Sequence, residues 1–151
     1  MGNNERIRRM IKRQTLYLIR GLTGSGKSTL AMMLQWAYET EDISVINVSA
    51  DDYFIDRPTG EYRFDPKQLK NAHEHSQRLA RIYLSMGSWH GAIMVHNTFS
   101  TNWEMQPYKD MAKEFGWSVF VIECQNDFGS THDVPDDVRE RMSKRWERNA
   151  A

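Results

Sequence analysis

Short apolar runs alternate with longer amphipathic stretches along this chain of 151 residues. Continuous β-branched and aromatic runs predict strands, and apolar positions that recur every three or four residues predict helices. The strands are expected at residues 15–20, 44–49, 92–96 and 118–124. The helices are expected at residues 28–40, from Asp65-Pro66 to about Met86, at 105–115 and at 135–148, with Gly87 and Gly116 placed to end the second and third.

This order of elements predicts the fold class. Strands that alternate with helices pair in parallel through right-handed crossovers, and the helices cover both faces of the sheet. We therefore expect an α/β three-layer sandwich with a parallel sheet of four to five strands. Ligands of such sheets bind at the carboxyl ends of the strands. Functional groups are expected in residues 21–28, at Asp51 and Asp52, at His96 and Asn97, and in residues 125–134.

The segment between the first strand and the first helix reads GLTGSGKS, which fits the phosphate-binding pattern G-x-x-x-x-G-K-[ST]. Its glycines let backbone N–H groups surround a polyphosphate at a helix N-terminus, its lysine reaches the β- and γ-phosphates, and its serine hydroxyl binds Mg²⁺. The pattern predicts a P-loop NTPase, with ATP and Mg²⁺ as cofactors. The predicted ATP-binding residues are Gly21, Thr23, Gly24, Ser25, Gly26, Lys27, Ser28 and Thr29.

Two adjacent carboxylates, Asp51 and Asp52, follow the second strand directly. Beside Mg²⁺·ATP, one carboxylate can order the water shell of the metal or accept the proton of an attacking hydroxyl. A helix cap or a solvated carboxylate pair is the alternative interpretation. Since neighbours in an extended segment point to opposite sides, we expect Asp51 to face the phosphates as general base and magnesium ligand. Asp52 is expected to form local hydrogen bonds or to contact the substrate.

Other residues near the strand ends are candidates for the acceptor site. The aromatic pair Tyr53 and Phe54 can wall an acceptor pocket or belong to the core. His96 has either a role in the site or a buried hydrogen-bonding role, and Arg20 either approaches the nucleotide or forms a salt bridge. The further substrate candidates are Phe54, Arg57, Asn97 and Thr98.

Bulk properties limit the remaining classes. The formal net charge is zero, so no global basic field favours nucleic acid, although residues 5–13 and 139–148 are locally basic. We expect a basic N-terminal segment at residues 1–14 and a single P-loop kinase domain at residues 15–151. The single cysteine, Cys124, fits a reducing, cytoplasmic location, in a host cell if the protein is phage-encoded. No apolar run is long enough to cross a membrane.

Several motifs together resemble the phage polynucleotide 5′-hydroxyl kinases and similar kinase-like P-loop domains. The motifs are GLTGSGKST, ADDYF, GEYRFDPKQLKNAH, HNTF at a strand end, WEMQPY, MAKEFGWSV and VPDDVRERM. The resemblance covers residues 15–146 and implies transfer of the ATP γ-phosphate to a hydroxyl. It implies that Asp51 is the general base and that Lys27 and Ser28 are the P-loop lysine and serine. It also implies the nucleotide-kinase-like fold of P-loop NTPases, with the strand order 2-3-1-4 plus any fifth strand.

Three features depart from the family pattern. Phe54 stands where an arginine binds the acceptor phosphate, Asn97 stands where the third strand ends in an aspartate, and residues 125–134 lack the catalytic arginines of the lid. A catalytic arginine in such a place contributes roughly 10³–10⁵ in rate. Either another cation substitutes, or turnover is weak, or the chain only binds nucleotide. The candidate substitutes are Arg57, Arg63, Lys109, Arg139 and a protonated His132.

Three functions are open at this point. The first is an ATP-dependent kinase that phosphorylates a hydroxyl of a nucleic acid or nucleotide, most simply a polynucleotide 5′-hydroxyl; a related kinase would phosphorylate a hydroxymethylated base or a small metabolite. The second is an ATP-binding regulatory protein with little turnover, which the arginine-free 125–134 segment favours. The third is a partner-binding protein that uses the basic ends of the chain.

Overall fold

A parallel sheet of four strands lies at the centre of the protein, in the order β2-β3-β1-β4. This order confirms the expected one, and no fifth strand occurs in the part of the chain that the structure describes. The computed structural model describes residues 2, 5, 14–86, 91–129 and 134–148. The strands are β1 (Thr15–Gly21), β2 (Ser44–Val48), β3 (Gly91–His96) and β4 (Ser118–Cys124).

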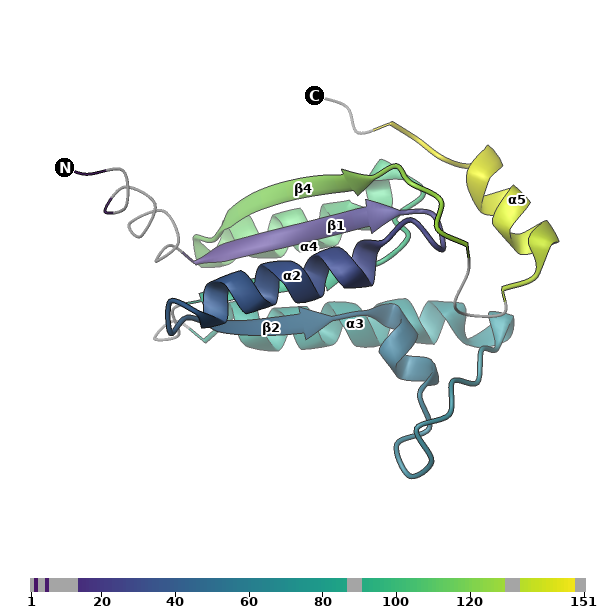
Figure 1. Cartoon of the computed structure of the whole chain (residues 1–151), viewed down its shortest axis with the longest axis horizontal. Helices are drawn as coiled ribbons and strands as arrows, with labels where there is room; N and C mark the ends of the chain where they lie inside the picture. Colours follow the sequence, from purple (N-terminus) through teal and green to yellow (C-terminus); the bar gives the residue numbers. More distant parts are fainter. Residues whose placement is uncertain (1, 3–4, 6–13, 87–90, 130–133, 149–151) are drawn as a thin grey trace.

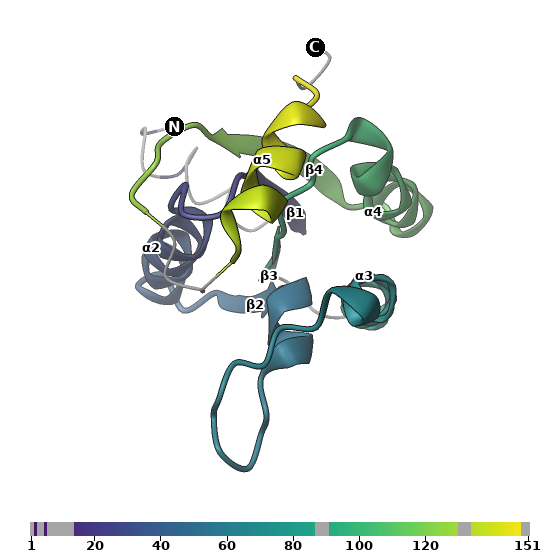
Figure 2. The ribbon, with the colours of Figure 1, turned by 90° about the vertical axis from the view of Figure 1, so that its right-hand side faces the viewer.

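Helices cover both faces of this sheet and complete the predicted three-layer sandwich (Figure 1 and Figure 2). One face carries α2 (Lys27–Glu39), and the other carries α3 (Leu69–Leu84) and α4 (Asn102–Phe115). The short helix α5 (Asp136–Lys144) lies beyond the carboxyl ends of the strands, where the arrows point in Figure 1. None of the helices in the described ranges is long and apolar enough to cross a membrane.

Alternate residues of the central strand β1 supply two separate cores. Leu16 and Leu18 are completely buried against side chains of α3 and α4, including Tyr108. Ile19 points to the opposite face and packs with Ala31 of α2. Burying one such aliphatic side chain contributes about 1.5–3 kcal/mol, so both faces of the sheet help to hold β1 and the loop that follows it in place.

Several helix boundaries differ from the predicted ones. The helix predicted from Asp65-Pro66 begins as the 3₁₀ helix η2 (Pro66–Gln68) and continues as α3 to Leu84. Helix α4 begins at Asn102 rather than at residue 105, because Thr101 and Glu104 form a capping box in which the Thr101 N–H donates to Glu104 Oε2 at 2.8 Å. Helix α5 ends at Lys144 rather than at residue 148. The residues after it leave the helix because they bind a buried arginine, as described below. The expected stop at Gly87 lies outside the described residues.

Candidate active site

A cavity of about 730 Å³ opens at the carboxyl ends of the strands. Its walls come from the loops after all four strands, which the parallel sheet brings to one edge. Lining residues come from the predicted P-loop, from the segment after β2, from the segments after β3 and β4, and from α5 and its flanks. The cavity therefore lies where the strand pattern predicts a ligand site.

The predicted P-loop wraps around the N-terminus of α2. Gly24 and Gly26 have φ angles of 81° and 92°, in the left-handed region that residues with a Cβ atom adopt only with strain. Gly26 is the N-cap of α2 and has no side chain to accept a hydrogen bond from the first turn of the helix. Such N–H groups and the positive end of the helix dipole favour an anion. All the predicted ATP-binding residues except Gly21 line the cavity.

Gly21 supports this loop from behind. A Cβ atom at this position would lie 2.8 Å from the carbonyl oxygen of Cys124 and would collide with Ser25 Oγ, so only glycine fits. The Gly21 N–H donates to the carbonyl oxygen of Thr98 at 3.2 Å. Gly21 therefore ties together the ends of β1, β3 and β4, and it does not line the cavity.

Lys27 and Asp51 line the same cavity, and their charges interact. Lys27 Nζ donates to the carbonyl oxygen of Leu22 at 3.0 Å, which keeps the ammonium inside the P-loop. Burial lowers the pKa of Lys27, and the carboxylate of Asp51 opposes this shift. The two residues to which the sequence gives catalytic roles thus share one cavity.

Tyr62 contacts Asp51 from the other side. Its hydroxyl donates to Asp51 Oδ1 at 3.2 Å, and burial together with the Asp51 charge raises the pKa of Tyr62. The phenol therefore stays protonated and orients the carboxylate. Sequence reasoning gave Tyr62 no role, although the residue belongs to the motif that carries the family resemblance. The bridge between Ile55 and Tyr62, which closes the loop, is the contact that brings it to Asp51.

The sequence analysis assumed that the segment with Asp51 and Asp52 is extended, which is wrong. The segment forms the 3₁₀ helix η1 (Ala50–Phe54). Ser49 Oγ caps it by accepting from the Asp51 N–H at 3.2 Å. The tight turn still separates the two carboxylates. Both side chains are exposed, but Asp51 lines the cavity and Asp52 does not.

His96 lies behind the P-loop serine. Its Nδ1 is 3.5 Å from Ser28 Oγ, the hydroxyl predicted to bind Mg²⁺. Burial lowers the pKa of His96, while Asp52 and Asp51 oppose the shift. No group of three or more metal-ligating side chains occurs within the described ranges. A hydroxyl and one carboxylate still fit Mg²⁺, because this ion keeps several waters and takes other ligands from phosphates.

Asn97, a predicted substrate residue, is buried and holds η1 in place. Its Oδ1 accepts from the Ala50 N–H at 2.7 Å, and its Nδ2 donates to Ser76 Oγ at 3.3 Å. The hydroxyl of Tyr108 also donates to Ser76 Oγ, at 2.9 Å. This chain of bonds fixes the element that carries Asp51. Asn97 and Thr98 both reach the cavity lining.

Aromatic rings wall the part of the cavity around Asp51. Phe54, Tyr62 and Phe64 all line it, and the Phe54 and Phe64 ring centroids are 5.2 Å apart. The Tyr62 and Phe64 rings lie nearly parallel, with centroids 6.5 Å apart. Phe54 is therefore both a core residue and a lining residue. Arg57, the predicted substrate residue in this loop, lies in the exposed turn and does not line the cavity.

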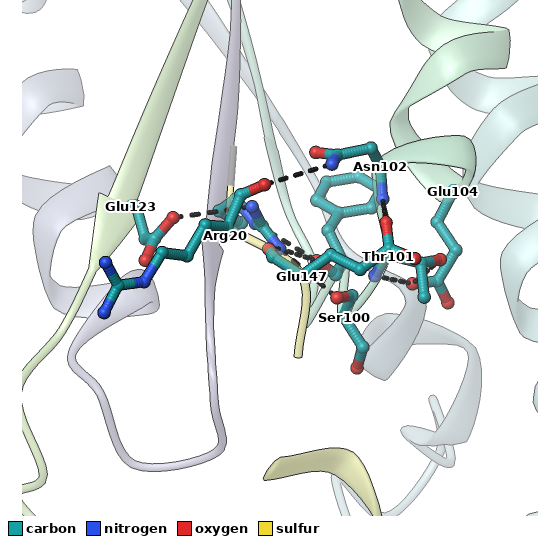
Figure 3. A network of polar contacts seen from close by, with 9 residues as sticks. Arg20, Ser100, Thr101, Asn102, Glu104, Glu123 and Glu147 are labelled. Carbon is teal, nitrogen blue, oxygen red and sulfur yellow. Dashed lines mark hydrogen bonds and ion pairs between the residues drawn. The ribbon is translucent and has the colours of Figure 1, made fainter. Parts of the chain in front are cut away.

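Arg20 forms a buried hub next to the P-loop (Figure 3). Its guanidinium donates to the carbonyl oxygens of Phe99 at 2.8 Å and Glu147 at 2.6 Å. It also forms an ion pair with Glu123 at 3.4 Å and stacks over the Trp146 ring. Of the two roles considered for Arg20, the structure shows the salt bridge. Arg20 also holds the segment after α5 in place through Trp146 and Glu147, a role that the sequence analysis missed.

Those cations proposed to replace the lid arginines that the structure describes do not line the cavity. Arg63 pairs with acidic residues of its own loop, and Arg139 lies 3.5 Å from Asp127 beside a second, smaller cavity. Lys109 lies on α4 and does not line the cavity. His132 lies outside the described residues. The lining contains another cation that sequence analysis did not consider, Arg145.

The described part of the 125–134 segment contacts the P-loop. The Phe128 N–H donates to the carbonyl oxygen of Gly24 at 2.8 Å. The Phe128 ring lies against Gly26, where a Cβ atom would be 3.1 Å from it. The start of this segment thus packs on the glycines that shape the phosphate site.

Solved structures show which fold the protein has. The APS kinase CysC of Mycobacterium tuberculosis, in a mutant form, matches with a TM-score of 0.57 at 15% identity, over 88% of this chain and 96% of that chain. CysC in complex with AMPPNP and APS matches with a TM-score of 0.56 at 18% identity, over 85% of this chain and 68% of that chain. The protein therefore has the P-loop kinase fold.

Sequence comparison identifies the family. The model of the AAA domain family matches residues 16–149, and the chain belongs to this family. It is 38% identical over 108 residues, 72% of its length, to human NEDD4-binding protein 2, but it spans only 6% of that protein. It is 30% identical over 127 residues to an uncharacterised protein of Pasteurella multocida (strain Pm70), covering 80% of this chain and 70% of that protein. The closer resemblance to phage polynucleotide kinases stays a prediction.

Proposed function

We propose that the protein is an ATP-dependent kinase that transfers the γ-phosphate to a hydroxyl of a nucleic acid or nucleotide. The observation that carries this proposal is the shared cavity of the P-loop and Asp51. A P-loop that binds phosphates and a carboxylate in the same cavity are the two parts that phosphoryl transfer to an alcohol requires. The P-loop kinase fold of the chain supports the same class of reaction.

Each residue has a defined task in this reaction. Backbone N–H groups of the P-loop and Lys27 would hold the phosphates of ATP, and Ser28 and, directly or through water, Asp51 would hold Mg²⁺. The acceptor hydroxyl gives its proton to the Asp51 carboxylate as its oxygen attacks the γ-phosphorus. The bond from that phosphorus to the bridging oxygen breaks, and ADP leaves. The Tyr62 hydroxyl orients the base.

The simplest acceptor is a polynucleotide 5′-hydroxyl. The aromatic wall around Asp51 favours a second candidate, the hydroxyl of a modified base or of a small metabolite. Among the described residues, the lysine and arginine of the cavity lining are Lys27 of the P-loop and Arg145 after α5, and the wall around Asp51 is built of aromatic rings. This wall therefore suits a flat, uncharged group better than an acceptor phosphate.

Phosphorylation assays with labelled ATP test the proposal. The acceptors are 5′-hydroxyl DNA, 5′-hydroxyl RNA, nucleosides and hydroxymethylated DNA. We expect label in at least one acceptor, and its loss in the Lys27→Ala and Asp51→Asn variants. ATP binding without transfer to any acceptor would contradict the kinase and support an ATP-binding regulator. Salt-sensitive nucleic-acid binding that survives Lys27→Ala would favour a partner-binding protein.

A further inference from the structure

The geometry points to Arg145 as the cation that binds the terminal phosphate of the nucleotide, an inference that rests on the proposed ATP site. Kinases of this class need positive charge around the transferred phosphoryl group, and the 125–134 segment contains no arginine. The charge would come instead from the end of α5, after that segment. This position was not apparent from the sequence, because it depends on where α5 ends and on what holds the residues after it.

Arg145 and Lys27 are the arginine and lysine side chains that line the main cavity, within the ranges that the structure describes. Met142, three residues before Arg145 on α5, lines the same cavity. Residues three apart lie on one face of a helix, so the end of α5 turns this face toward the P-loop. Lys27, at the start of α2, and Arg145, directly after α5, thus line the same cavity although they are far apart in the sequence.

The Arg145 guanidinium is available for a ligand. It forms no ion pair with any described residue, in contrast to Arg139, Arg141 and Lys144 of the same helix. The acidic residues that line the cavity already have partners. Asp51 accepts a hydrogen bond from the Tyr62 hydroxyl. Glu104 is engaged in the capping box with Thr101, and Glu123 pairs with Arg20. An anionic ligand is therefore the group that this charge can meet in the cavity.

The backbone that follows Arg145 is fixed to the sheet edge. Trp146 stacks on Arg20, and the Glu147 N–H donates to the carbonyl oxygen of Ser100 at 2.7 Å. Asn102 binds the same stretch twice, since its N–H donates to Glu147 Oε2 at 2.8 Å and its Nδ2 donates to the carbonyl oxygen of Arg148 at 3.1 Å (Figure 3). Arg145 is thereby anchored beside β1, the strand that leads into the P-loop.

This anchoring suits an arginine that acts on a developing charge. A guanidinium offers several N–H donors in a planar fork and can bind two oxygens of one phosphate. Because the chain after Arg145 is already ordered, less conformational freedom is lost when the side chain binds. We expect its partner to be the γ-phosphate, on which negative charge must be stabilised during transfer.

Calorimetry with ATP and ADP in the presence of Mg²⁺ tests this assignment without requiring turnover. In Arg145→Gln we expect the dissociation constant for ATP to rise about 10-fold or more, and that for ADP to change less than about 3-fold. Arg141→Gln is the matched control, because Arg141 lies one turn earlier, pairs with Asp137 and does not line the cavity. That variant should bind both nucleotides normally.

Equal weakening of ATP and ADP in Arg145→Gln would overturn the inference, because it would place the side chain on the base or the inner phosphates. Unchanged affinity for both nucleotides would also overturn it. A circular-dichroism spectrum and melting curve like those of the unmodified protein establish that the variant is folded. A wild-type protein that prefers ATP through Arg145 but phosphorylates no acceptor would refute the kinase while leaving this inference intact.

Discussion

The guanidinium carbon of Arg20 lies 4.1 Å from the centroid of the Trp146 ring, and the arginine side chain is completely buried. The two residues are 126 positions apart in the sequence, by subtraction of their numbers, and Arg20 immediately precedes Gly21 of the P-loop. Their contact therefore joins the start of the phosphate site to the segment after α5. A buried charge of this kind is stabilising only while all of its partners are present.

Arg20→Met should lower the free energy of unfolding by about 3–5 kcal/mol, because it leaves buried carbonyl oxygens and the carboxylate of Glu123 without their donor. Arg81→Met is the matched control. Arg81 also pairs with a glutamate and lies over an aromatic ring, but it is exposed. Urea unfolding of both variants measures the difference. Similar losses of stability in the two variants would show that the buried contacts of Arg20 contribute no more than the exposed ion pair of Arg81.

Asn97→Ala should loosen η1. The change removes the acceptor of the buried Ala50 N–H and lowers the free energy of unfolding by about 1–3 kcal/mol. Hydrogen exchange at the Ala50 amide measures the effect directly, and that amide should exchange much faster in the variant. Asn71→Ala, which removes an exposed bond to Gln68, serves as control. Unchanged protection of Ala50 in Asn97→Ala would contradict the role given to Asn97.

The strands, the P-loop and its place at the sheet edge could be predicted because they depend on local signals. Apolar runs identify strands one at a time, and the eight residues of the P-loop motif are contiguous. The family resemblance supplied the strand order. The 3₁₀ helix η1 could not be predicted, because two residues from different parts of the chain stabilise it. Ser49 accepts a hydrogen bond from the Asp51 N–H, and Asn97 accepts one from the Ala50 N–H.

The cationic part of the site could not be predicted for a similar reason. Arg20 reads in the sequence as an ordinary strand-end arginine, but its partner Glu147 lies 127 residues away. Arg145 reads as one of several charges on a basic helix, and its place in the cavity depends on the helix ending at Lys144. Most of the basic N-terminal segment lies outside the described residues, and so does His132. The expectations about both therefore stay predictions.

Stability should decrease on the acid side of neutrality, in part through His96. Burial holds the pKa of its imidazole below the ordinary value of about 6.5, so the unfolded chain takes up this proton at a higher pH than the folded protein. The contribution of His96 is therefore present above pH 6.5 and is lost as the pH falls below it, by up to about 1.4 kcal/mol per pH unit. His96→Gln should flatten this part of the curve of unfolding free energy between pH 7.5 and 5. An equally steep curve in His96→Gln would contradict the assignment.

Asp51→Asn should lower phosphoryl transfer at least about 100-fold, because the amide cannot accept the proton of the acceptor. ATP binding should persist. Asp52→Asn is the matched control, since Asp52 is the neighbouring carboxylate but does not line the cavity, and we expect a change of less than about 5-fold. Single-turnover assays with the best acceptor separate the two variants. Equal losses, or near-normal turnover in Asp51→Asn, would remove Asp51 from the role of general base.

Calorimetric titration of the protein with ATP and Mg²⁺ tests the central claim most directly. The account predicts saturable uptake of one nucleotide per chain and a loss of at least about 10-fold in affinity in Lys27→Ala, because that lysine contacts the phosphates. Absence of heat and of any shift in melting temperature at millimolar ATP would contradict the account, as would binding of equal strength in the Lys27→Ala variant.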